Sequence, residues 1–280
     1  MSGPARKPLV LLTNDDGHFS PGILTLAARL RRFADAWIVA PDRERSANSL
    51  SLTLRRPLRI QKVRQHVYAV DGTPADCVYI ALKKLLPRRP QLILSGMNLG
   101  CNLGQQDISY SGTVAAAIQG TFLDIPSAAV SLMPDRAGRF NFDTAARFVA
   151  GTAKVLLRKK LPSGITLNIN IPPDPIKGIR IAKLGQKRYN PEIIAKKDPR
   201  GELYYWIGPG NPQASGDDGT DVRAVLRGYI TITPLHRDLT DYGMMKLPVL
   251  EKLCASFLPI SYPSAAAVSE TRRSRAAWKR

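Results

Sequence analysis

Apolar runs that end in polar turns alternate with segments of helical periodicity along the first half of the chain. The first run, at residues 9–13, leads directly into Asp15, Asp16 and Gly17. A short continuous apolar run of this kind is typical of a strand that is buried on both faces. Apolar residues then recur at three- and four-residue spacing over residues 23–33, which predicts a helix. The first unit is therefore a strand, an acidic loop and a helix, as at the start of a doubly wound α/β domain.

The same alternation continues as far as a long periodic segment that ends near residue 159. We expect strands and helices in turn, with a glycine-rich loop at 96–104, as follows: strand 36–40, extended segments 51–63 and 65–70 that can form a hairpin, a helix opening at 72–76 and reaching about 86, strand 91–95, helix 114–122, strand 126–132 and helix 142–159. Pro74 suits the first turn of its helix. This pattern predicts an α/β fold with a mostly parallel sheet.

The pattern changes at about residue 162, where strand-like segments predominate. The expected elements are strands at 166–171 and 179–184, an arm of an exposed hairpin at 203–207, short segments at 222–226 and 229–233, and a helix at 246–258. We therefore divide the chain into an α/β core over residues 1–160, a β-rich C-terminal portion with a hairpin over 161–263, and a tail over 264–280. Tyr204, Tyr205 and Trp206 in the hairpin arm favour a contact between subunits, although their own domain can equally cover them.

Composition excludes several classes of protein. No apolar run approaches the roughly 20 residues that span a bilayer, so we expect no membrane segment. The three cysteines are scattered and odd in number, which favours a reducing cytoplasm over a disulfide framework or a zinc knuckle. Three histidines in 280 residues argue against a histidine-rich metal centre.

The formal net charge of +19 favours anionic partners such as nucleotides, polyphosphate or nucleic acid. Part of the excess lies in the last eleven residues, where one acid, Glu270, faces five cations: Arg272, Arg273, Arg275, Lys279 and Arg280. The segment from Ser264 lacks apolar periodicity, so we expect a disordered basic tail. Two interpretations of this tail remain: it is functionally neutral, or it is a tether for nucleic acid or polyphosphate.

Polar side chains follow three of the predicted parallel strands, at the point where each strand ends. The loops carry Asp15 and Asp16, then Ser46, then Asn98. In open α/β sheets ligands bind at the carboxyl ends of the strands, so these side chains are expected to converge. Adjacent carboxylates repel a phosphate and each other, whereas oxygen ligands suit Mg²⁺ or Mn²⁺. A plain Asp-Asp-Gly turn is the alternative.

A second feature precedes the helix expected at 114–122. Ser111, Gly112 and Thr113 lead this helix, and N–H groups at a helix start lack intrahelical partners, so they can bind an anion. The alternative is an ordinary N-cap by Ser111 or Thr113. The glycine motifs of dinucleotide folds and P-loops are absent from the sequence, as is the G-x-S-x-G elbow of α/β-hydrolases.

Several short motifs, in order along the chain, resemble those of the SurE family of survival proteins. They span about residues 8 to 258, without the basic tail, and comprise residues 14–17 (NDDG), 21–22, 40–43 with Ser46, 72–78, 95–102, 110–117, 208–209, 219–221 and 232–236. Met97 stands where isoleucine is usual in that family, and Ala47 where glycine is usual.

The resemblance implies a cytoplasmic phosphatase with a Rossmann-like three-layer core that forms homodimers or homotetramers through its C-terminal portion. It implies hydrolysis of nucleoside 5′- and 3′-monophosphates, and of short polyphosphate in some members, with one divalent ion per subunit. Carried over by motif, the metal ligands are Asp15, Asp16, Ser46 and Asn98.

Within this hypothesis, one of the paired aspartates, Asp15 or Asp16, acts as a base or nucleophile. Phosphate is expected to contact Asn102, Ser111, Gly112 and Thr113, although a structural role for Asn102 stays open. The competing hypothesis is a non-catalytic α/β protein that binds nucleotides or RNA, which the net charge of +19 favours.

Overall fold

The computed structural model describes residues 6–159, 161–208, 210 and 212–255. The expected tail at 264–280 lies outside these residues. Within them the chain forms two compact units, of which the first reaches to Arg237 and the second begins at Asp238. The predicted boundary at residue 160 falls between a helix and a strand of the first unit, and that division stays a prediction.

The first unit is built on a nine-stranded sheet with the order β3-β4-β2-β1-β5-β6-β7-β13-β8. Neighbouring strands from β4 to β7 are parallel, whereas β3 and β4 are antiparallel, as are β7 and β13. The strands are β1 (Leu9–Thr13), β2 (Asp35–Pro41), β3 (Ile60–Arg64), β4 (Val67–Val70), β5 (Leu92–Leu99), β6 (Ser127–Leu132), β7 (Ile165–Ile171), β8 (Gly178–Ile181) and β13 (Tyr229–His236). This arrangement confirms the predicted α/β class with a mostly parallel sheet.

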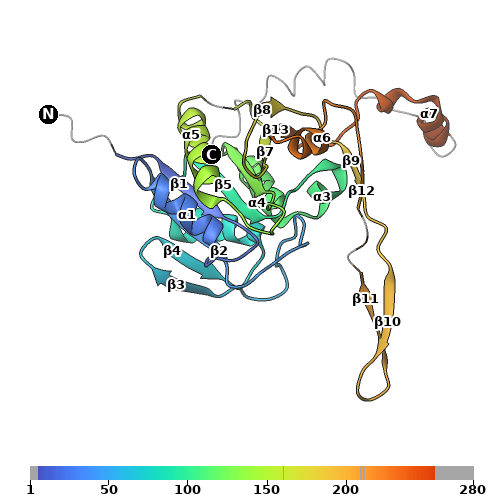
Figure 1. Cartoon of the computed structure of the whole chain (residues 1–280), viewed down its shortest axis with the longest axis horizontal. Coiled ribbons are helices and arrows are strands. Elements are labelled where there is room, and N and C mark those ends of the chain that lie inside the picture. The colour runs from blue at the N-terminus through green and yellow to red at the C-terminus, as the bar shows by residue number, and fades with distance from the viewer. Residues whose placement is uncertain (1–5, 160, 209, 211, 256–280) are drawn as a thin grey trace. The chain divides into compact units, whose positions relative to one another are not determined.

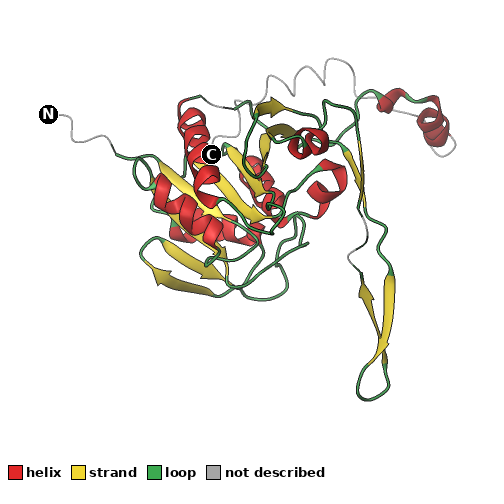
Figure 2. Ribbon diagram, viewed as in Figure 1, coloured by secondary structure: helices red, strands yellow, loops and turns green. Residues whose placement is uncertain are grey.

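Helices cover both faces of this sheet and give three layers (Figures 1 and 2). The described helices are α1 (Pro21–Leu30), α2 (Pro74–Ile80), the short π-helix η1 (Ala81–Leu85), α3 (Gly104–Tyr110), α4 (Gly112–Phe122), α5 (Phe142–Arg158) and α6 (Asp221–Leu226) in the first unit, and η2 (Met244–Lys246) and α7 (Pro248–Ala255) in the second. The predicted segment at 222–226 is the helix α6.

Strand β1 is apolar throughout because its alternate residues pack into core clusters on opposite faces of the sheet. Val10 and Leu12 belong to a core cluster with the apolar faces of α1 and α5, whereas Leu11 packs in a separate cluster with α2 and α4. Both faces are therefore buried, and every residue of β1 is buried. Burial of this kind removes each apolar side chain from water and contributes about 1.5–3 kcal/mol for each large one.

Two differences from the sequence-based expectation lie beside each other. The loop predicted to begin at residue 96 begins later, because β5 continues to Leu99 and pairs Asn98 with Ser131 of β6 after a register shift. The helix α3 has no apolar periodicity and is absent from the prediction. It is held by long-range contacts to the segment that contains β9 (Gln186–Arg188).

Two small antiparallel pairs complete the first unit. The segment β9 pairs with β12 (Gln213–Ser215), and β10 (Ile193–Lys197) pairs with β11 (Leu203–Ile207). The second pair confirms the predicted hairpin at 203–207, and every residue of both its strands is exposed (Figure 1). Among the described residues, no helix combines the length and the apolar character that crossing a membrane requires.

Candidate active site

The acidic loop lies at the carboxyl end of β1, in the middle of the parallel part of the sheet. The buried side chain of Asn14 donates from Nδ2 to the carbonyl of Gly17 at 2.9 Å, which closes the loop on itself. Gly17 has φ +97°, a left-handed conformation that glycine adopts without strain. The next N–H, from His18, donates to the carbonyl of Pro41 at the end of β2. The loop is thus fixed before any ligand arrives.

Asp15 is almost fully buried, with 6% of its surface exposed. Burial raises the pKa of its carboxyl group, and a hydrogen bond from the hydroxyl of Thr113 to Oδ1 opposes that shift. The backbone of Gly112 lies against the same carboxylate, since an added Cβ would be 3.0 Å from its Oδ2. Asp15 is therefore packed against the first turn of α4.

Asp16 is less buried, yet its pKa rises to about 7. Burial is the larger cause and the negative charge of Asp15 is the second. Its Oδ2 is buried and has no hydrogen-bond partner. A buried carboxylate oxygen without a donor is costly, and a divalent cation beside it would supply the missing positive charge. The donor set therefore fits a cation.

Ser46 lies in the polar loop that follows β2. The N–H of Arg45 donates to the carbonyl of Asp15 at 2.7 Å, which ties this loop to the acidic loop. Ser46 is exposed, and its hydroxyl donates to Oε1 of Glu44 at 2.6 Å. Since its proton is used there, the Ser46 oxygen keeps its lone pairs for another partner.

Asn98 lies near the carboxyl end of β5, one strand over from Asp15 and Asp16. Its Nδ2 donates to the carbonyl of Gly100 at 2.8 Å. This bond uses the amide nitrogen, so the side-chain oxygen is the atom left to bind a cation. Gly100 has φ +130°, which lets the chain turn directly after the strand.

The predicted phosphate-binding residues lie in two places. Ser111 is the N-cap of α4, and its oxygen accepts the N–H of Val114 at 3.1 Å, as the N-cap alternative predicts. The N–H groups of Gly112 and Thr113 belong to the first turn of the same helix, where intrahelical partners are lacking. Thr113 is fully buried behind Asp15.

Asn102 is buried within a polar network. Its Nδ2 donates to the hydroxyl of Ser131 at 2.7 Å, and its N–H donates to Oδ1 of Asn170. Its carbonyl accepts from the side chains of Asn168 and Asn170, each at 2.9 Å. These bonds fix the loop after β5, and they fit the structural role that the sequence left open.

These residues surround an open cleft of about 360 Å³, here called the acidic cleft. Six of the eight predicted site residues line it, whereas Gly112 and Thr113 lie behind Asp15. Its lining comprises Asp15, Asp16, Glu44, Ser46, Ala47, Asn98, Leu99, Cys101, Asn102, Asp107, Tyr110, Ser111 and Tyr189. The lining contains four carboxylates and no lysine or arginine. Within the described residues, no three His, Cys, Asp or Glu side chains are grouped as a metal site, so a cation here would need the hydroxyl and amide oxygens as well.

One wall of this cleft, formed around Asp107, was not predicted from the sequence. Asp107 of α3 is buried and accepts hydrogen bonds from Lys187 at 2.6 Å and from the hydroxyl of Tyr189 at 2.7 Å. Burial disfavours the charge on Lys187, but its bonds to Asp107 and Tyr189 outweigh that effect and raise its pKa. About 80 residues separate the partners in sequence, so no local pattern indicates this contact.

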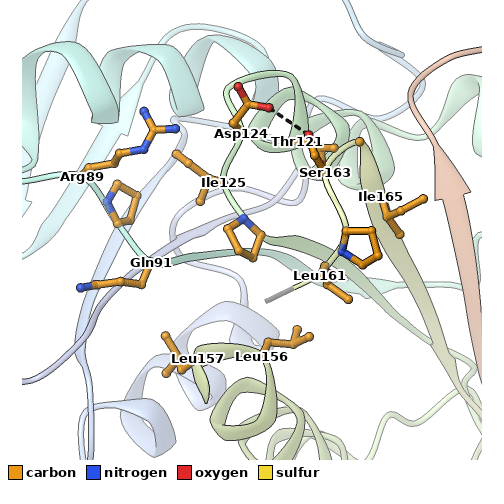
Figure 3. A pocket seen from close by; sticks show the side chains of 14 residues that line it. Arg89, Gln91, Thr121, Asp124, Ile125, Leu156, Leu157, Leu161, Ser163 and Ile165 are labelled. Carbon is orange, nitrogen blue, oxygen red and sulfur yellow. Dashed lines mark hydrogen bonds between the residues drawn. The ribbon is translucent and has the colours of Figure 1, made fainter. Parts of the chain in front are cut away.

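A second hollow, of about 400 Å³, lies at the opposite edge of the sheet, beside the starts of β5, β6 and β7. Figure 3 shows Leu156, Leu157, Leu161 and Ile125 around it, with Arg89 toward one side. None of the predicted site residues lines it. The candidate chemistry therefore belongs to the acidic cleft.

The fold and the cleft define an α/β protein with an acidic site at the carboxyl edge of a parallel sheet. The family model described as "Survival protein SurE" matches residues 10–191. A relative from Pelobacter propionicus named 5'-nucleotidase SurE is 47% identical over 242 residues, which cover 85% of this chain and 97% of the relative. Another of that name, from Mannheimia succiniciproducens, is 48% identical and covers 84% and 95%.

Among solved structures, the crystal structure of SurE protein from Aquifex aeolicus has a TM-score of 0.75 with this chain. It is 41% identical and covers 87% of this chain and all of the other. The chain belongs to the SurE family, as its motifs indicated.

Proposed function

We propose that this protein is a phosphomonoesterase that hydrolyses nucleoside 5′-monophosphates, and also 3′-monophosphates and short polyphosphate, to release phosphate. The alignments with relatives named 5'-nucleotidase extend over nearly the whole length of those relatives, which supports the reaction class. The observation that carries the proposal is the unpaired, buried Oδ2 of Asp16 beside the carboxylate of Asp15. Membership of this family disfavours the non-catalytic alternative.

The proposed activity requires one divalent cation, Mg²⁺ or Mn²⁺, per subunit. Of the four carboxylates in the cleft lining, Asp107 is paired with Lys187, whereas Asp15, Asp16 and Glu44 have no lysine or arginine beside them in the lining, so phosphate binding needs a compensating positive charge. Asp15, Asp16, Ser46 and Asn98 would hold this cation through oxygen atoms. When bound, it supplies Lewis acidity toward the phosphoryl group and lowers the pKa of a bound water.

The chain's own groups then bind, orient and accept protons. The N–H groups of Gly112 and Thr113, at the start of α4, and the Ser111 hydroxyl would hold non-bridging phosphate oxygens, and in the ligand-free cleft the Thr113 N–H contacts the carboxyl group of Asp15. Asn102 keeps the loop after β5 in place for this contact. Asp15 or Asp16 would accept a proton from the attacking water. The pKa of about 7 for Asp16 belongs to the cleft without a cation, and a bound cation would lower it, because positive charge favours the ionised carboxylate.

Phosphate release from a panel of nucleoside 5′- and 3′-monophosphates tests this proposal. We expect release with Mn²⁺ or Mg²⁺, none with chelator, and a loss of at least a hundredfold in Asp16→Asn, because the carboxylate is both ligand and candidate base. Circular dichroism should show that the variant is folded. Release that persists in chelator, or in a folded Asp16→Asn protein, would exclude this centre.

We also propose that the β10–β11 hairpin joins copies of this chain into a homodimer or homotetramer. Three consecutive residues of β11 stay strongly exposed in the single chain: Tyr205 at 64%, Trp206 at 60% and Ile207 at 75%. Tyr205 and Ile207 share one face of the strand and Trp206 lies on the other, so both faces of the hairpin expose apolar side chains, as is typical of an interaction site. The free thiols of Cys77 and Cys101 support a reducing compartment such as the cytoplasm.

A further inference from the structure

Glu44 is a carboxylate of the acidic cleft to which the proposed function gives no task. It lines the cleft beside Ser46, which is two residues further along the same loop. The hydroxyl of Ser46 donates to its Oε1 at 2.6 Å, a short and strong bond for a charged acceptor. The exposed side chain of Glu44 does not support the core, so a role in packing does not explain its position.

The charge of Glu44 is not compensated by its neighbours. The arginines on either side of it, Arg43 and Arg45, form ion pairs with Asp42 at 4.0 and 3.6 Å. Within the described part of the chain, Glu44 has no ion pair shorter than 4.0 Å. Its charge acts on the cleft, where it adds to the cost of ionising Asp15 and Asp16.

The loop that carries Glu44 is fixed at both ends. At one end, the N–H of Arg45 donates to the carbonyl of Asp15 at 2.7 Å. At the other end, the N–H of Ser49 donates to the carbonyl of Tyr110 at 3.0 Å. A side chain on this loop therefore keeps its place relative to the paired aspartates.

We propose that Glu44 is a positioning residue that holds the hydroxyl of Ser46 so that its oxygen faces the cation bound by Asp15 and Asp16. The inference rests on the proposed function, since it needs a cation at that centre. A serine hydroxyl has one proton and two lone pairs. With the proton directed to Glu44, the lone pairs are directed elsewhere and can bind a cation. Partners that orient a ligand in this way typically change metal affinity by about 10- to 100-fold.

Binding of Mn²⁺ to the full-length protein without nucleotide tests the inference, with free Mn²⁺ measured by electron paramagnetic resonance. We expect Glu44→Ala to weaken Mn²⁺ binding about tenfold. Glu44→Gln keeps an acceptor for the hydroxyl and should retain most of the affinity. Glu202→Gln, which removes a carboxylate that does not line the cleft, should bind as the wild type does.

A double-mutant cycle separates positioning from charge. If Glu44 acts through Ser46, Glu44→Ala adds little to the loss caused by Ser46→Ala, because the hydroxyl that it orients is already gone. Additive losses, or equal losses in Glu44→Ala and Glu44→Gln, would overturn the inference. All these variants should keep the thermal midpoint of the wild type in chelator, since both side chains are exposed.

Asp16→Asn distinguishes this inference from the function on which it rests. If Asp16→Asn loses Mn²⁺ affinity and Glu44→Ala does not, the centre stands and the role of Glu44 is wrong. If neither variant changes Mn²⁺ binding, the proposed metal centre itself is wrong.

Discussion

At the scale of the residue, the site is built from groups that are costly to bury without a ligand. Asp15 is buried against Thr113. The neighbouring residue, Asp16, has a buried carboxylate oxygen that accepts no hydrogen bond. Both carboxyl groups have a raised pKa because burial disfavours their charge. In the free protein, the geometry that suits a cation is therefore destabilising at neutral pH.

The pKa of Asp16 predicts how the stability of the metal-free protein depends on pH. The carboxyl group titrates near 3.8 when unfolded and at about 7 when folded, so between these values the folded state holds a proton that the unfolded chain has released. The contribution of the Asp16 carboxyl group to the free energy of unfolding is therefore fully present below pH 4 and is lost progressively as pH rises from about 4 to 7. In chelator, Asp16→Asn should therefore match the wild type within a few tenths of a kcal/mol only below pH 4, and should exceed it by an amount that grows to roughly 2 kcal/mol at pH 8, a figure reduced for the partial exposure of the side chain.

Urea unfolding followed by circular dichroism measures this difference at each pH. Mn²⁺ added at pH 8 should stabilise the wild type and leave Asp16→Asn unchanged. Equal stability of the two proteins at pH 8 in chelator would contradict the raised pKa.

The hydroxyl of Thr113 gives a second prediction at this scale. Thr113→Val keeps the shape of the buried side chain but removes the donor to Asp15. We expect a loss of about 2 kcal/mol in the free energy of unfolding at pH 8, as for a lost hydrogen bond to a charged group. Thr113→Ser keeps the hydroxyl and is the control. If Val and Ser variants unfold at the same urea concentration, this bond contributes nothing.

At the scale of the element, the site depends on how closely helices approach the sheet. A Cβ added to Gly22, in the first turn of α1, would lie 2.4 Å from the carbonyl oxygen of Met97 in β5. A side chain at this position forces α1 away from the strand that carries Asn98. Gly22 is therefore required by a close approach between two backbones.

Two glycine-to-alanine substitutions test this requirement. Gly22→Ala should destabilise the protein by about 2–3 kcal/mol, because the backbone contact has to open. Gly151→Ala, in the exposed face of α5, meets no atom within 4 Å and should stabilise by about 0.5–1 kcal/mol through helix propensity. Thermal unfolding of the two variants and the wild type measures both changes in stability, and we expect a lower midpoint for Gly22→Ala and a higher one for Gly151→Ala. A neutral or stabilising effect of Gly22→Ala would contradict the close approach.

At the scale of the whole molecule, charge is distributed unevenly. The chain carries a net charge of +19, yet no lysine or arginine lines the acidic cleft, and of its four carboxylates only Asp107 is paired with a lysine, Lys187. The general field attracts anions, whereas the cleft repels them until a cation is bound. In the proposed reaction, binding of the substrate phosphate would therefore depend on the cation rather than on basic side chains.

The exposed hairpin gives a prediction at the same scale. If β11 joins copies of the chain, Trp206→Ser combined with Ile207→Ser should lower the molar mass measured by light scattering to that of a smaller assembly. Lys196→Ser, on the paired strand β10, changes an exposed polar residue of the same hairpin and should leave the mass unchanged. A wild-type protein with the mass of one chain would exclude the proposal.

The sequence by itself determined the order of the core elements and the position of the acidic site. Continuous apolar runs predicted strands buried on both faces, and β1 packs Leu11 and Leu12 into different clusters as such a strand must. Asp15 and Asp16 follow β1, and Asn98 lies near the end of the neighbouring strand β5, because parallel strands bring their carboxyl ends to one edge. These features depend on short stretches of chain, so local patterns suffice to predict them.

Only the tertiary structure decided which side chains complete the cleft. The contact of Asp107 with Lys187 and Tyr189 joins segments about 80 residues apart, and α3 forms there without apolar periodicity. The extension of β5 to Leu99 likewise depends on the partner strand β6. Burial and the charge of a neighbour set the pKa of Asp16, and both depend on the packed fold. These features each arise from contacts between segments that are distant in the sequence, so no single stretch of sequence is sufficient to predict them.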